Sequence, residues 1–244
     1  QNLINQYLRL NRKQLDETEV RKLYEFLFKS SPKNPRPKHY FAQWLHTCGH
    51  YNEAEGLFKE LVENHQNVFN YFYSYGRLLL DMKQYGEAEK RFRQVIELHV
   101  GHAMAHESLA QALSALGILA EDESDIRLAE EYYTEAESEF RRAVFWAKKA
   151  GNPQALIFRQ YGRHLLERKR WDEARRAFQE AVQEQPEHWE NHWGMGSALA
   201  GLEQWSNAAD VLRTALEMAP PELEPPASDE IPQLLEKCEA ELAK

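Results

Sequence analysis

The chain has 244 residues, of which 43% are hydrophobic and 28% are charged, and its formal net charge is −9. It is long enough for one or two domains, and no stretch reaches the ~18 consecutive apolar residues of a membrane-spanning helix. The acidic balance argues against generic nucleic-acid binding, which needs a basic surface. We therefore expect a soluble protein, with the cytoplasm favoured, and the absence of a starting Met indicates a processed or trimmed chain.

The chain contains only two cysteines, Cys48 and Cys238. Two thiols so far apart in the sequence predict neither a disulfide framework nor a zinc site. We expect both to be ordinary buried thiols.

A short pattern recurs along the chain, in which an aromatic residue is followed three residues later by alanine. The four alanines fall into two pairs that are each separated by 34 residues: Ala54 and Ala88, Ala174 and Ala208. Four residues after each alanine comes a large residue: Phe58, Phe92, Phe178 and Leu212. Twelve residues before each comes a small one: Ala42, Gly76, Gly162 and Gly196. The period predicts repeated helix pairs, in which small residues let two antiparallel helices approach and the large residue fills the space beside them.

This pattern resembles the tetratricopeptide repeat family, with a small residue at position 8, an aromatic residue at 17, Ala at 20 and Phe at 24. The resemblance implies an all-α, right-handed superhelical solenoid of antiparallel helix pairs, because one pair cannot bury its apolar face alone. The frame gives six units: 1–34, 35–68, 69–102, 103–154, 155–188 and 189–222.

The unit at 103–154 departs from the frame, because its Ala136 and Phe140 come 14 residues late. Fourteen residues are two heptads, so we expect each helix of this pair to be seven residues longer, with Ser124 or Asp125 capping the second helix. An apolar seam should run along that helix: Ile126, Ala129, Tyr133, Ala136, Phe140, Ala143 and Ala147. Residues 117–140 carry nine acids and one base, so nearly all the net charge lies on this acidic hairpin.

Beyond Pro220 several prolines break the helical pattern, and apolar residues then recur at helical spacing from Ile231 to Leu242. Residues 223–244 are therefore expected to form a linker and a capping helix over the last unit.

Nothing in the sequence indicates catalysis, and we expect no catalytic, cofactor-binding or metal-binding residues. His102 and His106, like His188 and His192, have metal-pair spacing, but both pairs fall at the same repeat positions and are better explained by packing. Gly196 belongs to the repeat pattern and follows no strand, so the glycines around it do not form a phosphate loop. The sequence predicts a binding scaffold and not an enzyme.

The resemblance also implies a concave groove lined by the first helix of each unit, at positions 2, 5, 9 and 12. Those positions hold six arginines and two glutamates. They suit a protein or peptide partner that carries acidic groups. The predicted groove residues are Arg9, Arg36, His39, Gln43, His46, Asn70, Tyr73, Arg77, Gln111, Arg159, Arg163 and Trp193.

Other interpretations stay open from the sequence alone. The acidic hairpin 117–140 could occupy a neighbouring copy's groove and so build a self-assembling structural protein. Arginines and aromatic residues also suit single-stranded nucleic acid, which the net charge opposes. The family's clamp for chaperone C-termini needs Lys and Asn where this chain has His39 and Gln43, which excludes that function. Partner identity, pathway and oligomeric state do not follow from the sequence.

Overall fold

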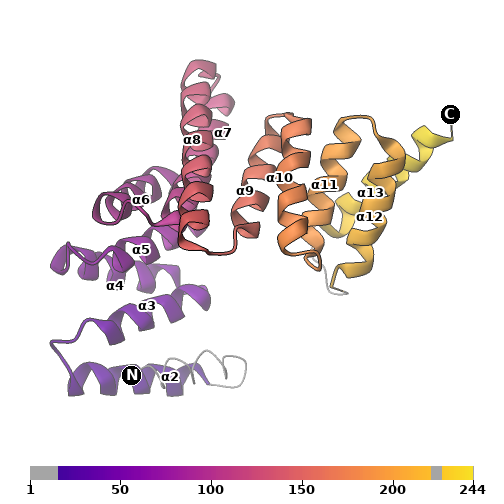
Figure 1. Ribbon diagram of the computed structural model, residues 1–244. Coiled ribbons are helices and arrows are strands. Elements are labelled where there is room, and N and C mark those ends of the chain that lie inside the picture. The colour runs from indigo at the N-terminus through magenta and orange to yellow at the C-terminus, as the bar shows by residue number, and fades with distance from the viewer. Residues whose placement is uncertain (1–15, 221–226, 244) are drawn as a thin grey trace. The chain divides into compact units, whose positions relative to one another are not determined.

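The computed structural model describes residues 16–220 and 227–243, and every regular element in these ranges is an α-helix (Figure 1). Two compact units, 1–100 and 101–244, divide the chain. The first unit contains α2 (Glu17–Ser30), α3 (Arg36–Thr47), α4 (Tyr51–Asn64), α5 (Phe69–Asp81) and α6 (Tyr85–Leu98). The second contains α7 (Ala103–Asp122), α8 (Ile126–Ala150), α9 (Ala155–Glu167), α10 (Trp171–Glu184), α11 (Trp189–Gly201), α12 (Trp205–Met218) and α13 (Ala227–Leu242).

The repeat residues form the contacts between paired helices. The position-20 alanines are all fully buried: Ala54, Ala88, Ala136, Ala174 and Ala208. The glycines at position 8 lie against the large residue at position 24. A β-carbon on Gly76 would lie 2.7 Å from Phe92 Cε1, and one on Gly196 would lie 2.7 Å from Leu212 Cγ. The sequence pattern therefore describes how the two helices of a pair approach each other.

One turn geometry recurs between the two helices of a pair. Each of these turns has a residue with positive φ: Gly49, Lys83, Ser124, Lys169 and Glu203. The next residue donates its N–H to the carbonyl five residues earlier, as from Gln84 to Leu79 at 2.8 Å and from Arg170 to Leu165 at 2.9 Å. This bond closes the helix C-terminus. Only one of the five residues is a glycine, so residue type alone does not reveal the turn.

The pair α7–α8 is longer than the others, with 20 and 25 residues against 13 and 14 in α9 and α10. Asp125 caps α8, since its Oδ1 accepts the Leu128 N–H at 3.0 Å. The seam along α8 is buried from Ala129 to Ala147, whereas Ile126, predicted to belong to it, is exposed. The apolar seam therefore begins about one turn inside the helix.

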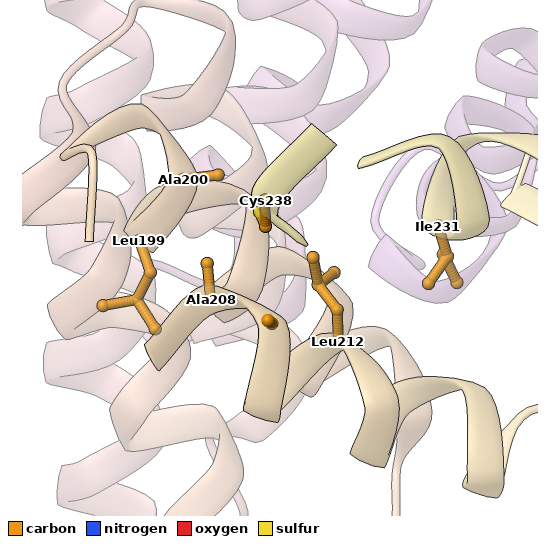
Figure 2. Close-up of a cluster of buried hydrophobic side chains, with 7 residues drawn as sticks. Leu199, Ala200, Ala208, Leu212, Ile231 and Cys238 are labelled. Carbon is orange, nitrogen blue, oxygen red and sulfur yellow. The ribbon is translucent and has the colours of Figure 1, made fainter. Parts of the chain in front are cut away.

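The last helix, α13, packs on α11 and α12 (Figure 2). Ile231 and Cys238 are fully buried there. They join a cluster with Leu199, Ala200, Ala208, Ala209 and Leu212. The prediction that both cysteines are buried is wrong for Cys48, which is exposed. None of the described helices combines the length and the apolar character that a membrane crossing requires.

Candidate functional site

In the first unit, two predicted groove residues hold α3 against α5. His39 is buried and its Nε2 lies 2.9 Å from Ser74 Oγ, which also accepts a hydrogen bond from Gln43 Nε2 at 3.0 Å. Burial lowers the pKa of His39 to about 4, so the imidazole is neutral at pH 7. These side chains connect two neighbouring helices, which limits what they offer to a partner.

The other predicted residues of this unit are more accessible. His46 Nε2 pairs with Asp81 Oδ2 at 2.6 Å. Arg36 and Asn70 are exposed, while Tyr73 and Arg77 are half-buried on α5. We call the last four residues, Arg36, Asn70, Tyr73 and Arg77, the first-unit face. Arg9, the remaining prediction near the N-terminus, lies outside the described residues.

In the second unit, Arg159 on α9 is buried against α11. Its Nε lies 3.1 Å from Glu190 Oε2, and its Nη1 donates to Asn191 Oδ1 at 3.3 Å. Asn191 is fully buried and donates in turn to the carbonyls of Ala181 and Gln185. Burial lowers the pKa of Arg159, and the carboxylate of Glu190 opposes that effect. Arg159 is therefore a buried link between two first helices and not a solvated arginine.

Arg163, one turn further along α9, remains accessible, with 42% of its side chain exposed. Its guanidinium lies 5.9 Å from the centroid of Trp193, which stacks on Trp189, and its Nη2 is 3.5 Å from Glu190 Oε1. Two apolar side chains lie on the same helix at positions 2 and 12, the exposed Leu156 and the half-buried Leu166. The second-unit face is formed by Leu156, Arg163, Leu166 and Trp193.

Gln111, on α7, is occupied within its own helix. Its Nε2 donates to Glu107, a fully buried carboxylate that also accepts a hydrogen bond from Ser108 at 3.1 Å. Nine of the twelve predicted groove residues are at least partly exposed. Six of these nine lie on the two faces defined above: Arg36, Asn70, Tyr73, Arg77, Arg163 and Trp193.

The acidic hairpin is less uniformly solvated than its composition indicates. Glu139 is buried, 2.5 Å from both His106 Nδ1 and Arg142 Nη1. Arg168, in the α9–α10 turn, pairs with Glu121 at 3.2 Å and with Glu130. The composition groups all these acids as one surface, but several of them fasten α8 to α7 and to the following pair.

The histidine pairs have packing and capping roles. His102 is the N-cap of α7, where its Nδ1 accepts the Ala105 N–H at 3.0 Å, and His192 bonds the Pro186 carbonyl. Within residues 16–220 and 227–243, no group of three or more His, Cys, Asp or Glu side chains has the arrangement of a metal site.

Several of these links were missed from the sequence, although a signal for two of them exists. His39 and Ser74 are 35 residues apart, and so are His46 and Asp81. Side chains on the first helices of consecutive repeats therefore meet when they are 35 residues apart, which is one residue more than the repeat length. Ser74 and Asn191 lie outside the four repeat positions that the resemblance assigns to the groove.

Known proteins support the same architecture. The sequence profile of the tetratricopeptide repeat (TPR) matches residues 73–132 and 161–222, which together make up half of the chain. A comparison with the sequences of curated proteins finds no significant match. Among solved structures, the chain is similar to TTC0263, a thermophilic TPR protein of Thermus thermophilus, with a TM-score of 0.65 and 18% identity over 86% of this chain and 100% of that one.

Two further structures share the fold at low identity. PilW, a type IV pilus biogenesis factor, has a TM-score of 0.64 and 13% identity over 85% of this chain and 91% of its own. YrrB, described as a TPR protein with an unusual peptide-binding site, has a TM-score of 0.53 and 18% identity over 82% of this chain and 93% of its own. Because the profile matches half of the chain and covers parts of both units, this chain belongs to the tetratricopeptide repeat family.

Proposed function

We propose that the protein is a scaffold whose first helices bind an extended peptide or protein segment that carries carboxylates. Tetratricopeptide repeat proteins mediate protein–protein interactions, and the YrrB structure is described by its peptide-binding site. The observation that carries the proposal is the arrangement of Arg163 over Trp193 on the second-unit face.

Arg163 suits a carboxylate because a guanidinium has five N–H donors and Glu190 engages it only at 3.5 Å. The Trp193 ring, which stacks on Trp189, holds the guanidinium. The exposed Leu156, on the same helix as Arg163, offers an apolar side chain to the partner. A rigid aromatic residue next to arginine is the combination that dominates many protein interfaces.

The first-unit face supports the same chemistry. Among residues 16–220 and 227–243, Arg36 and Arg77 make no ion pair within 4.0 Å. Arginines that lack an acidic neighbour on an otherwise acidic chain favour a partner that supplies the acids.

Selection of displayed peptides on the intact protein tests this proposal. The enriched peptides should contain Asp or Glu next to an apolar residue. Their affinity should fall at least tenfold, or about 1.4 kcal/mol, when Arg77 and Arg163 are both changed to Glu. Arg159 is left unchanged, because its reversal would bury a carboxylate beside Glu190.

The matched control reverses Arg141 and Arg176, which are exposed on the second helices α8 and α10. The two double variants change the net charge of the protein by the same amount. Equal loss of affinity in the two variants would mean that bulk charge, and not these faces, binds the peptide.

A further inference from the structure

Exposed large apolar side chains cluster at the outer end of the α7–α8 pair. Twelve such side chains occur in the described part of the chain, and four of them lie within residues 118–128. They are Ile118, Leu119, Ile126 and Leu128. Scattered apolar residues on a surface need no explanation, but a cluster in the most acidic segment of the chain does.

At this outer end of the pair, which we call the tip, the two helices carry the same order of residue types around their interface. Ala120 on α7 and Ala129 on α8 are both buried, in one cluster with Tyr133. Successive residues are about 100° apart around a helix. Leu119 and Leu128 therefore precede the interface alanines by one step, and Glu121 and Glu130 follow them by one step. Because the helices are antiparallel, both leucines fall on one side of the pair and both glutamates on the other.

The contacts of Arg168 confirm which side is which. Arg168, from the α9–α10 turn, pairs with Glu121 and Glu130 together, and its guanidinium lies 4.1 Å from the centroid of Tyr133. The glutamate side of the tip thus faces α9 and α10 and is held by them. The leucine side faces away from them.

The leucine side is apolar and uncovered. Leu119 is 46% exposed and Leu128 is 37% exposed. Leu116 and Tyr132 are half-buried one turn further in, and Tyr132 packs against the alanine cluster below. We call these four residues, Leu116, Leu119, Leu128 and Tyr132, the leucine face. Asp122 and Glu131, each two residues after its interface alanine, are exposed on the same helices, and Glu131 pairs with Arg127 at 3.3 Å.

We propose that the leucine face is a second docking surface, which binds an amphipathic basic helix of another protein. The apolar row spans two helices, as a groove for one apolar helix face requires. The surrounding carboxylates select lysine or arginine on the partner's flanks. A second copy docked on the same face is disfavoured, because it would bring two tips with nine acids and one base each against each other.

A synthetic probe tests the proposal directly. A fluorescent peptide of leucine and lysine, about four helical turns long and with its leucines at helical spacing, should bind the intact protein. A scrambled peptide of the same composition should bind at least tenfold more weakly. Changing Leu119→Ser together with Leu128→Ser should also weaken binding at least tenfold. Higher salt should weaken binding to the unaltered protein.

Two control variants locate the effect. Phe145→Ser removes an exposed apolar ring from α8 outside the tip, and Trp193→Ala alters the second-unit face; both should leave the affinity for the basic peptide unchanged. Equal binding of the two peptides, or equal loss in Phe145→Ser, would overturn the proposal. The proposal would also be overturned if the unaltered protein sedimented as a dimer and the double serine variant as a monomer. The leucine face would then bind a second copy of this chain.

Discussion

Gly162 and Phe178 touch so closely that a β-carbon on Gly162 would lie 2.7 Å from Phe178 Cε2. The ring is fully buried between α9 and α11, where Gly194 contacts it from the other side. Gly162→Ala should therefore lower the free energy of unfolding by ~1–3 kcal/mol, despite the better helix propensity of alanine. Gly56→Ala is the matched control, since no atom lies within 4 Å of a β-carbon there and the variant should be slightly stabilised. Urea unfolding that ranks the two variants in the opposite order would contradict the packing role of position 8.

The buried group of His106, Glu139 and Arg142 should act as a unit. His106→Ala removes a hydrogen bond at 2.5 Å and leaves one carboxylate oxygen of Glu139 buried without that donor. Breaking a buried pair in this way costs ~3–5 kcal/mol. The double change of His106→Leu and Glu139→Leu should cost less, because it removes the buried charge as well. Thermal melting of both variants measures the difference in stability, with Lys90→Ala as an exposed control. A double variant that is less stable than His106→Ala would show that the charges themselves hold the hairpin together.

Two buried histidines predict how stability depends on pH. Burial lowers the pKa of His39 and of His164 to about 4, with Arg168 and Arg170 adding to the effect at His164. In the unfolded chain both groups titrate near a pH of about 6.5. Below that pH the unfolded state binds protons that the folded state does not, so the free energy of unfolding should fall as the pH drops from about 6.5 toward 4, by roughly 1 kcal/mol per pH unit for each histidine.

Urea unfolding at neutral pH and at two mildly acidic values, about pH 6 and about pH 5, reveals this slope. His39→Gln and His164→Asn together should flatten it over that interval, whatever they do to the absolute stability. An unchanged slope in the double variant would assign the pH dependence to other groups.

The tip of the α7–α8 pair should be dispensable for folding. Its alanine cluster, Ala120, Ala129 and Tyr133, is separate from the other apolar clusters. Deleting residues 117–123 together with 127–133 shortens both helices by seven residues and retains Asp125 as the cap. The trimmed protein should keep its helical circular dichroism and unfold cooperatively, and it should not bind the basic peptide. Loss of cooperative unfolding would mean that the tip belongs to the core.

The sequence predicted the packing inside each pair better than the chemistry of the exposed faces. Ala88 and Phe92 recur because two helices at close approach leave few alternatives, so spacing alone predicts the contact. Arg159 illustrates the limit: its position correctly places it on a first helix, but its burial depends on Glu190 and Asn191 in the next repeat. Composition assigns Glu139 to the exposed acidic hairpin. Its burial was missed for a similar reason, because its partner His106 lies 33 residues earlier in the sequence.

The docking of α13 gives the two thiols of the chain different reactivities. Cys238 is fully buried where α13 packs on its neighbours, and burial raises the pKa of its thiol, so a thiol reagent reaches it only when that helix detaches. Cys48 is exposed and reacts without any opening. The ratio of the two labelling rates on one sample therefore reports how often the last helix leaves its neighbours, with the fast thiol serving as the reference for reagent and buffer.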